Sequence, residues 1–572
     1  MREDTLLRPA TTGTTAPLTG VALTATGRGF PLQLAIHQLR LLGAELTEHH
    51  KSSAPARLTL GVGSGTVTCA LDWAGPVAMP LASEADVQAA CGLAAVHGRR
   101  YGTPQPLGIE YASAVAGVLA VQGLLAARLA VLRGGSARRV RTSVAGAALL
   151  AVGQYLAAAT ADDPPEPTRA DAGPPPFTSA DGVRFEIEAL DPGQWLAFWS
   201  GLGVARPVVG QGWPPFQLRF ATGSCALPVE LDLATRQLSY RQLTDAAVSV
   251  GVSIVPVRAQ GPSGYRLPPW RIESVPGPGS PLPPAPAGAG PLAGLVVVEM
   301  TRRLQGPLAG HLLALLGAEV IRVEPLGGDP LRGVPPMVGE VSARFHALNR
   351  NKRVFEADPR SPAGRRAIRE LIGGAEVFLH NLAPGKAESF GLDPGQLLTE
   401  QPGLVHAWAS GWGELFNADG NALDGSTMSG GMRGGTLSGS TLSGSTLSGG
   451  FLPVGTDYLV QAHSGLAALV TPPGRPVAPA LLTITDIFGG LVSATGVLAA
   501  LVARAGSGFG QRVDSSLFSA AVTLLDMASP PDVPPARFPA VAPEELAADP
   551  RFAAALQHDS CVLPRAPWQF DA

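Results

Sequence analysis

The sequence predicts an α/β protein: doubly wound, Rossmann-like parallel sheets joined to a smaller α+β domain. Three observations lead to this prediction. Apolar strand-like runs alternate with helical patterns in residues 17–160 and 291–530, as in βαβ units. Blocks of the first stretch recur in the second. Segments rich in Pro and Gly, 161–176 and 273–290, separate these two stretches from the unit 177–272.

The first half begins with residues 17–50, which read as a strand, a glycine-containing turn, a helix and a second strand. Residues 107–132 form another strand-to-helix unit, and 138–160 a strand or turn that leads into a helix. In the small unit, a helix is expected to start after Asp191, and residues 240–258 read as a helix followed by a strand.

The second half repeats this alternation. LVVVEM is an apolar strand, and the helix after it is closed by Gly317 before the strand EVIRVEP. A helix opened by Ser361-Pro362 and two further strands follow, ending in SGWG. The expected domains are therefore a first large domain (1–160), a small α+β domain (177–272), a second large domain (291–530) and a C-terminal tail (531–572).

Two repeats connect the halves. Residues 108–148 align without a gap with 481–521 at an offset of 373, and residues 17–50 resemble 291–325 at an offset of 274. The first half therefore lacks 99 residues that the second half has between these blocks. Residues 562–570 also echo 264–272, so the second half is expected to contain the strand that closes the small domain. Identical pairs in the repeats are Pro17 and Pro291, Gly43 and Gly317, Gly117 and Gly490, Gly123 and Gly496, Arg139-Val140 and Arg512-Val513, and Ser143 and Ser516.

Composition limits the function classes. The formal net charge of −3 gives no electrostatic case for binding nucleic acid or an anionic membrane. The cysteines, Cys69, Cys91, Cys225 and Cys561, have no metal-site spacing, and the N-terminus has no apolar signal segment, so we expect no metal and a cytoplasmic location. The apolar runs 113–132 and 487–503 contain polar residues, which favours buried core helices over membrane spans.

The repeated block differs at the one position that could do chemistry. The second copy has Asp486, between a β-rich run and an apolar helix, where the first copy has Ser113. A carboxylate in that place can be a helix cap or a catalytic group. Retained packing residues and a single retained carboxylate predict one working site and one scaffold.

Motifs over residues 291–525 match a known family in order. They are PLAGLVVVEMT, LLALLGAEVIRVEP, GGDPLR, LNRNKR, HNLAPG, FGL, SGWG, GTDYLVQAHSGL, TDIFGG and GFGQRVD. The second half thereby resembles the class III (CaiB/BaiF-like) CoA-transferases, which include formyl-CoA transferase, carnitine CoA-transferase and the α-methylacyl-CoA racemases. The first half resembles them only at its two ends and in the small domain.

The resemblance implies that Asp486 is the nucleophile and forms an aspartyl-CoA thioester, from which CoA passes to a carboxylic acid. Pro325 and Ser389 replace basic CoA contacts of the family, and Arg322, Arg332 or Lys386 could substitute for them. The implied CoA contacts are Leu304, Gln305, Ala357, Asp358, Pro359, Arg360, Asn381, Leu382, Ala383, Val454, Gly455, Thr456 and Asp457.

Family members are interlocked homodimers, so the resemblance implies a fused single-chain pseudo-dimer with a degenerate first half. This pseudo-dimer is expected to need no partner chain, and further association into a homo-oligomer is left as an alternative. The implied partners are an acyl-CoA and a carboxylic acid, with CoA as substrate and no tightly bound cofactor. Alternatives are an acyl-CoA isomerase or racemase, a repurposed enzyme and a non-catalytic member. Racemases have a His where this chain has Thr456, and His463 is interpreted as structural. The low-complexity segment 425–450 is expected to be a surface loop rather than a lid.

Overall fold

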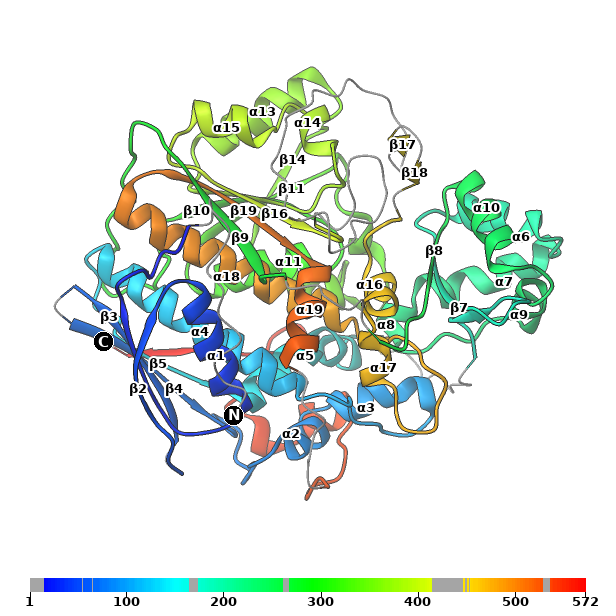
Figure 1. Cartoon of the computed structure of the whole chain (residues 1–572), viewed down its shortest axis with the longest axis horizontal. Helices are drawn as coiled ribbons and strands as arrows, with labels where there is room; N and C mark the ends of the chain where they lie inside the picture. Colours follow the sequence, from blue (N-terminus) through cyan, green and yellow to red (C-terminus); the bar gives the residue numbers. More distant parts are fainter. Residues whose placement is uncertain are drawn as a thin grey trace.

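Two long helices, α4 (Tyr111–Leu132) and α18 (Ile484–Ser507), pack against each other between two sheets, and a smaller unit lies to one side (Figure 1). The computed structural model describes residues 15–53, 55–63, 65–163, 173–260, 267–413, 446–447, 450–451, 453–527 and 535–571. Most of the segment 425–450 therefore lies outside the described residues.

The larger sheet belongs mainly to the second half and is the parallel sheet that the alternation predicts. Its first six strands run parallel to one another, and the seventh, β9, is antiparallel to β19. The carboxyl ends of the parallel strands therefore share one edge, where ligands bind in open α/β sheets. In order across the sheet, the strands are β14 (Arg353–Glu356), β11 (Glu319–Glu324), β10 (Val296–Met300), β15 (Val377–His380), β16 (Val405–Ser410), β19 (Gly510–Ser516) and β9 (Trp270–Val275).

The smaller sheet, in the first half, is mixed, so the prediction of a parallel sheet is wrong there. Its central strands β3 and β4 form an antiparallel hairpin. Only two residues separate these strands, and a parallel connection needs a crossover of about a dozen residues or more. The order is β2 (Glu45–His50), β1 (Ala22–Thr26), β3 (Ala56–Val62), β4 (Gly65–Asp72), β5 (Arg139–Ser143) and β22 (Gln569–Asp571).

The last strand of each sheet comes from the other half of the sequence. Strand β9 precedes the second half and pairs with β19, with Ile272 opposite Val513. Strand β22, at the end of the chain, pairs with β5, with Phe570 opposite Val140. The echo between 264–272 and 562–570 therefore reflects two strands that close the large sheets, and the expectation that it closes the small domain is wrong.

The helices cover both sheets. Helices α4 and α18 are long and apolar enough to cross a membrane by length and composition, and 83% and 94% of their most apolar windows are buried inside the protein. Such burial is what core helices have, as the sequence predicts. The other helices that surround the two sheets are α1 (Phe30–Leu41), α2 (Glu84–Ala90), α3 (Leu93–Gly98), α5 (Val144–Ala159), α11 (Gln305–Leu315), α12 (Ala343–Asn349), α13 (Pro362–Gly373), α14 (Lys386–Ser389), α15 (Pro394–Glu400), α16 (Asp457–Ser464), α17 (Leu466–Val470), α19 (Leu517–Met527) and α20 (Pro543–Ala548).

The small unit has its own core. Helix α6 starts after Asp191, as expected, because the Asp191 side chain accepts hydrogen bonds from the backbone N–H groups of Gly193 and Gln194. Buried aromatic rings, among them Trp195 and Phe216, which stack with centroids 4.3 Å apart, fill the centre. The unit consists of β6 (Phe177–Thr178), β7 (Arg184–Glu188), β8 (Ser253–Pro256), α6 (Pro192–Gly201), α7 (Arg206–Gln217), α8 (Arg219–Thr222), α9 (Val229–Thr235) and α10 (Tyr240–Val250).

Candidate active site at the start of helix α18

Asp486 lies in the first turn of α18, and it is only partly buried. Its backbone N–H donates to Oδ1 of Asp457 at 3.0 Å. The same Oδ1 accepts from the backbone N–H and the hydroxyl of Thr485, at 2.7 and 2.5 Å. Asp457 is 3% exposed. Because its carboxylate accepts hydrogen bonds from the N–H groups that open the helix, the Asp486 side chain is not needed to cap α18. The reading of Asp486 as a plain helix cap is therefore wrong, because Asp457 is the cap.

The electrostatic environment of Asp486 works in two directions. Burial raises its pKa well above the ordinary value, and the neighbouring Asp457 charge raises it further. The Arg303 guanidinium opposes this and lowers the pKa. Burial also raises the pKa of Asp457, against the hydrogen bonds that it accepts from Thr485, Gln461 and Asp486. Two neighbouring carboxyl groups whose pKa values are both raised are a typical mark of a functional site.

The turn after β10 is fixed beside α18. Gln305 donates from Nε2 to the Ser410 carbonyl at 3.2 Å, which joins this turn to the end of β16. A Cβ atom on Gly490 would lie 2.7 Å from the Gln305 carbonyl, so glycine is needed for this close approach. Leu304 and Gln305 are themselves 6% and 4% exposed, so they line the site mainly through their backbone.

The HNLAPG turn is tied to the same place. Asn381 donates from Nδ2 to the Arg302 carbonyl at 2.8 Å and accepts from the Arg302 N–H at 2.9 Å. Trp408 donates to the Leu382 carbonyl at 3.0 Å, and Ala383 is exposed. The turns after β10, β15 and β16 therefore meet at one edge of the sheet.

The remaining predicted CoA contacts are placed in two groups. Ala357, Asp358, Pro359 and Arg360 follow β14, the outermost strand, two strands away from β10. Ala357 is 5% exposed, whereas Arg360 is exposed. Val454, Gly455 and Thr456 precede α16, and a Cβ on Gly455 would lie 2.5 Å from Gly411 Cα, so this segment packs directly on the SGWG turn.

Thr456, just before α16, and His463, within it, bear on the racemase alternative. Thr456 is 8% exposed, and its hydroxyl has no hydrogen-bond partner in the described part of the chain. His463 is buried, lies 5.4 Å from the Trp412 ring between centroids, and burial lowers its pKa to about 4. The His463 ring thus packs against aromatic side chains, and its structural role stays a prediction.

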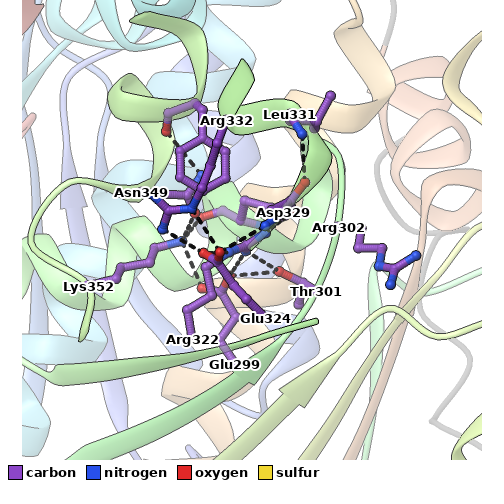
Figure 2. A network of polar contacts seen from close by, with 12 residues as sticks. Glu299, Thr301, Arg302, Arg322, Glu324, Asp329, Leu331, Arg332, Asn349 and Lys352 are labelled. Carbon is purple, nitrogen blue, oxygen red and sulfur yellow. Dashed lines mark hydrogen bonds and ion pairs between the residues drawn. The ribbon is translucent and has the colours of Figure 1, made fainter. Parts of the chain in front are cut away.

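A buried network of charges lies behind the turn after β10 (Figure 2). Arg322 is 1% exposed and pairs with Glu299, Glu324 and Asp329 at 2.5, 3.2 and 2.6 Å. Lys352 pairs with Glu299 at 2.8 Å, and burial lowers the Lys352 pKa to about 8. Arg322 is fully used by these acids, so the suggestion that it substitutes for a lost CoA contact is wrong.

The other two suggested substitutes are nearer to solvent. Arg332 pairs with Glu324 at 2.8 Å, and its side chain is 32% exposed. Lys386 is half-buried with its ammonium 5.6 Å from the centroid of the Phe390 ring. Of the three candidates, Lys386 is the one without a carboxylate partner in the described residues. These residues also contain no cluster of three or more His, Cys, Asp or Glu side chains that could hold a metal.

The first half has a matching arrangement that the sequence analysis missed. Glu84 accepts from the N–H groups of Ala112 and Ser113, both at 2.8 Å, at the start of α4. Glu84 stands 373 residues before Asp457, and Ser113 is completely buried. The signal was available: VQA and GLAA recur at the same offset in 87–95 and 460–468.

The profile of a family described as "CoA-transferase family III" matches residues 70–258, 292–445 and 452–552. A succinate–glutarate CoA-transferase of Agrobacterium fabrum (strain C58 / ATCC 33970) is 32% identical over 235 residues, which are 40% of this chain and 51% of that protein. The succinyl-CoA:glutarate CoA-transferase of Mus musculus is 31% identical over 41% of this chain and 47% of its own length.

An acetyl-CoA:oxalate CoA-transferase of Acetobacter aceti is 29% identical over 42% of this chain and 54% of that protein. The chain thus spans about half the length of the curated relatives it matches. Among solved structures, a CAIB/BAIF family protein from Brucella suis is 32% identical over 41% of this chain and 56% of that chain, with a TM-score of 0.34.

Proposed function

Because this chain belongs to CoA-transferase family III, we propose that it moves CoA from an acyl-CoA donor to a carboxylic acid, with Asp486 as the nucleophile. The observation that carries the proposal is the division of labour between two carboxylates. Asp457 is buried and accepts hydrogen bonds from the N–H groups of Thr485 and Asp486, and Asp486, in the first turn of α18, is only partly buried, so its own carboxylate is not needed to cap the helix.

The proposed reaction is a sequence of acyl transfers. The Asp486 carboxylate attacks the thioester carbonyl, which forms a mixed anhydride and releases CoA thiolate. The thiolate attacks the aspartyl carbonyl, giving the aspartyl-CoA thioester and the free donor acid. The acceptor carboxylate attacks this thioester, which again forms an anhydride and thiolate. The thiolate then attacks the acceptor's carbonyl, and Asp486 leaves as a carboxylate.

The surroundings of Asp486 support this chemistry. Each tetrahedral intermediate carries a negative oxygen, and the positive end of α18 and the Arg303 guanidinium favour negative charge nearby. Arg303 also opposes the rise in the Asp486 pKa, which keeps more of the carboxylate ionised and nucleophilic. The raised pKa has a use as well, since a more basic carboxylate is a better nucleophile.

The chemical class of the two acid substrates is also a proposal. The relatives named above carry the names of succinate, glutarate and oxalate transferases, so small dicarboxylic acids and their CoA thioesters are the first compounds to test. A racemase activity is disfavoured because Thr456 stands where the racemases have a His, and a hydroxyl of very high pKa cannot act as a base near neutral pH.

We also propose that the two halves form a pseudo-dimer within one chain and that the degenerate first half is a scaffold. The exchange of β9 and β22 supports this arrangement, because each sheet is completed by a strand from the other half. A fragment of residues 288–572 lacks β9 and the small unit. It is expected to aggregate, because it exposes the edge of β19 and the apolar face of α18. A soluble, active fragment would contradict the pseudo-dimer.

The direct experiment is mass spectrometry after incubation with succinyl-CoA, glutaryl-CoA or oxalyl-CoA. We expect a CoA-sized adduct on the peptide that contains Asp486, sensitive to hydroxylamine as a thioester should be. Asp486→Asn is the control that should carry no adduct. An adduct on another residue would overturn the mechanism. In a second assay, the acceptor acid is labelled with oxygen-18 and turns over many times. Turnover without an adduct and without oxygen-18 in the released donor acid would also overturn the mechanism.

A further inference from the structure

A hollow lies where the small unit meets both large domains, away from the predicted substrate contacts. It contains about 530 Å³ of space not filled by protein atoms, part of it open to solvent. Its walls come from five separate segments: Arg100 just after α3, Pro174 and Pro176, Arg184 and Arg236 of the small unit, and Arg475 in the loop before α18. None of the residues assigned to Asp486 chemistry lines it.

The wall charges are unbalanced. Four arginines, Arg100, Arg184, Arg236 and Arg475, face one carboxylate, Asp232, which pairs with Arg236 at 2.7 Å. Arg475 is exposed, and its guanidinium lies 5.9 Å from the centroid of the Tyr101 ring, with no carboxylate paired to it among the described residues. The guanidinium groups therefore have few acids to neutralise them.

One of these arginines, the half-buried Arg184, has unused hydrogen-bonding capacity. Arg184 donates from one terminal nitrogen to the Val477 carbonyl at 3.1 Å, while its buried Nε–H has no partner in the described residues. Arg100 is 6% exposed and donates to main-chain carbonyls of residues 173, 175 and 479, which hold the group in place without cancelling its charge. Burial and the nearby Arg100 charge lower the pKa of Arg184, whereas the carboxylates of Glu186 and Asp232 raise it.

Cations gathered in a partly enclosed space are stabilised by an anion that can accept several of their hydrogen bonds. We propose that this hollow is a binding site for a small polyanion that carries phosphate or carboxylate groups. Arg184 and Arg475 contact the anion, and Arg100 is held behind them by the main chain. The volume suits a compact ligand rather than a macromolecule.

The position of the site gives the anion a structural effect. The loop that carries Arg475 continues into Ala480, whose N–H donates to Gln461 Oε1 at 2.8 Å. Gln461 donates in turn to Asp457 at 2.5 Å, and Asp457 opens α18. A ligand in the hollow thus fixes the small unit against the loop that leads to Asp486. The inference rests on the hollow itself and not on the proposed transferase function.

Calorimetric titration of the full chain with inorganic phosphate and with citrate tests the site, at constant ionic strength set by sodium chloride and without any CoA thioester. We expect saturable binding of at least one of the two anions and a rise in the melting temperature that follows its concentration. The anion that binds more tightly shows whether the natural ligand carries phosphate or carboxylate groups. No saturable binding of either anion, or equal effects of chloride, would overturn the proposal.

Three variants locate the site. Arg184→Gln and Arg475→Gln should each weaken the binding about tenfold, since each removes a charge-assisted contact. Arg475 is on an exposed loop, so its replacement keeps the test valid even if Arg184→Gln fails to fold. Arg241→Gln, an exposed arginine of the small unit outside the hollow, is the matched control and should bind as the wild type does. Unchanged affinity in Arg475→Gln would contradict the assignment.

Discussion

The Tyr111 hydroxyl donates a hydrogen bond of 2.9 Å to the main-chain carbonyl of Ile484, and Ile484 is the residue that the repeat offset of 373 assigns to Tyr111. The same relation recurs nearby. Gln122 donates to Thr495 Oγ1 at 3.1 Å, and His97 donates to the Val470 carbonyl at 3.1 Å, each across 373 residues. In a twofold assembly, residues close to the axis contact their own equivalents. The three pairs are arranged as the proposed pseudo-dimer predicts, with an approximate twofold axis between α4 and α18.

Asp486→Asn should reduce transfer at least about 1000-fold, because the nucleophile is lost while its shape is kept. The matched change in the other half, Ser113→Ala, should leave turnover within about twofold, since Ser113 is buried and serves only the scaffold. Steady-state assays of both purified variants measure this contrast. Loss of activity in Ser113→Ala would mean that the first half takes part in catalysis.

The difference in stability between the Asp486→Asn variant and the wild type should depend on pH. The folded-state pKa of Asp486 is raised, so ionisation costs stability; the cost is absent below the ordinary pKa of about 3.9 and grows as the pH rises above it. The variant should therefore melt higher than the wild type at pH 7 and equally at pH 3.5. Calorimetric melting curves of both proteins at the two pH values test this prediction. A variant less stable than the wild type at pH 7 would contradict it, because the ionised Asp486 side chain would then stabilise the folded state.

Arg303→Gln should move the acid limb of the kcat/KM profile to higher pH. Arg303 lowers the pKa of Asp486, so removing its charge lets that pKa rise and delays formation of the carboxylate. Arg366→Gln, an exposed arginine on α13, is the control and should leave the limb in place. If both variants keep the wild-type profile, Arg303 does not act on Asp486.

Asp457→Asn should move the same limb in the opposite direction, to lower pH, because the charge that raises the Asp486 pKa is removed. It should also lower the free energy of unfolding by about 1–3 kcal/mol, since the amide nitrogen that replaces Oδ2 cannot accept the hydrogen bond from Gln461. Denaturant unfolding and pH profiles measure the two effects. A limb displaced upward would contradict the assigned roles.

Two glycines of the repeat should be equally intolerant of a side chain. A Cβ on Gly496 would lie 2.8 Å from Val513 and one on Gly123 3.0 Å from Val140, on β19 and β5, the strands that pair with β9 and β22. Each replacement by Ala should cost about 1–3 kcal/mol of unfolding free energy. Gly506→Ala, on α18 with nothing within 4 Å of its Cβ, should instead be neutral or stabilising. A large difference between Gly496→Ala and Gly123→Ala would contradict their equivalence.

The sequence by itself determined the order of elements in the second half, the buried nature of α4 and α18, and the position of Asp486. These follow from local signals: strand-length apolar runs, glycines and caps at helix ends, and a repeat with a constant offset. The echo of Trp270 in Trp568 was also visible in the sequence. The sequence did not reveal which strands these two segments pair with, because the partner of an edge strand depends on packing across the whole molecule.

Only the tertiary structure decided what individual side chains do. The family resemblance suggests Asp457 and Arg322 for CoA binding, yet each is buried, one under the start of α18 and the other among three acids. The mixed sheet of the first half and the cluster of Arg100, Arg184 and Arg475 likewise join segments far apart in the chain. Burial and charge pairing depend on distances in space, and spacing along the chain reports these only within a single helix or strand.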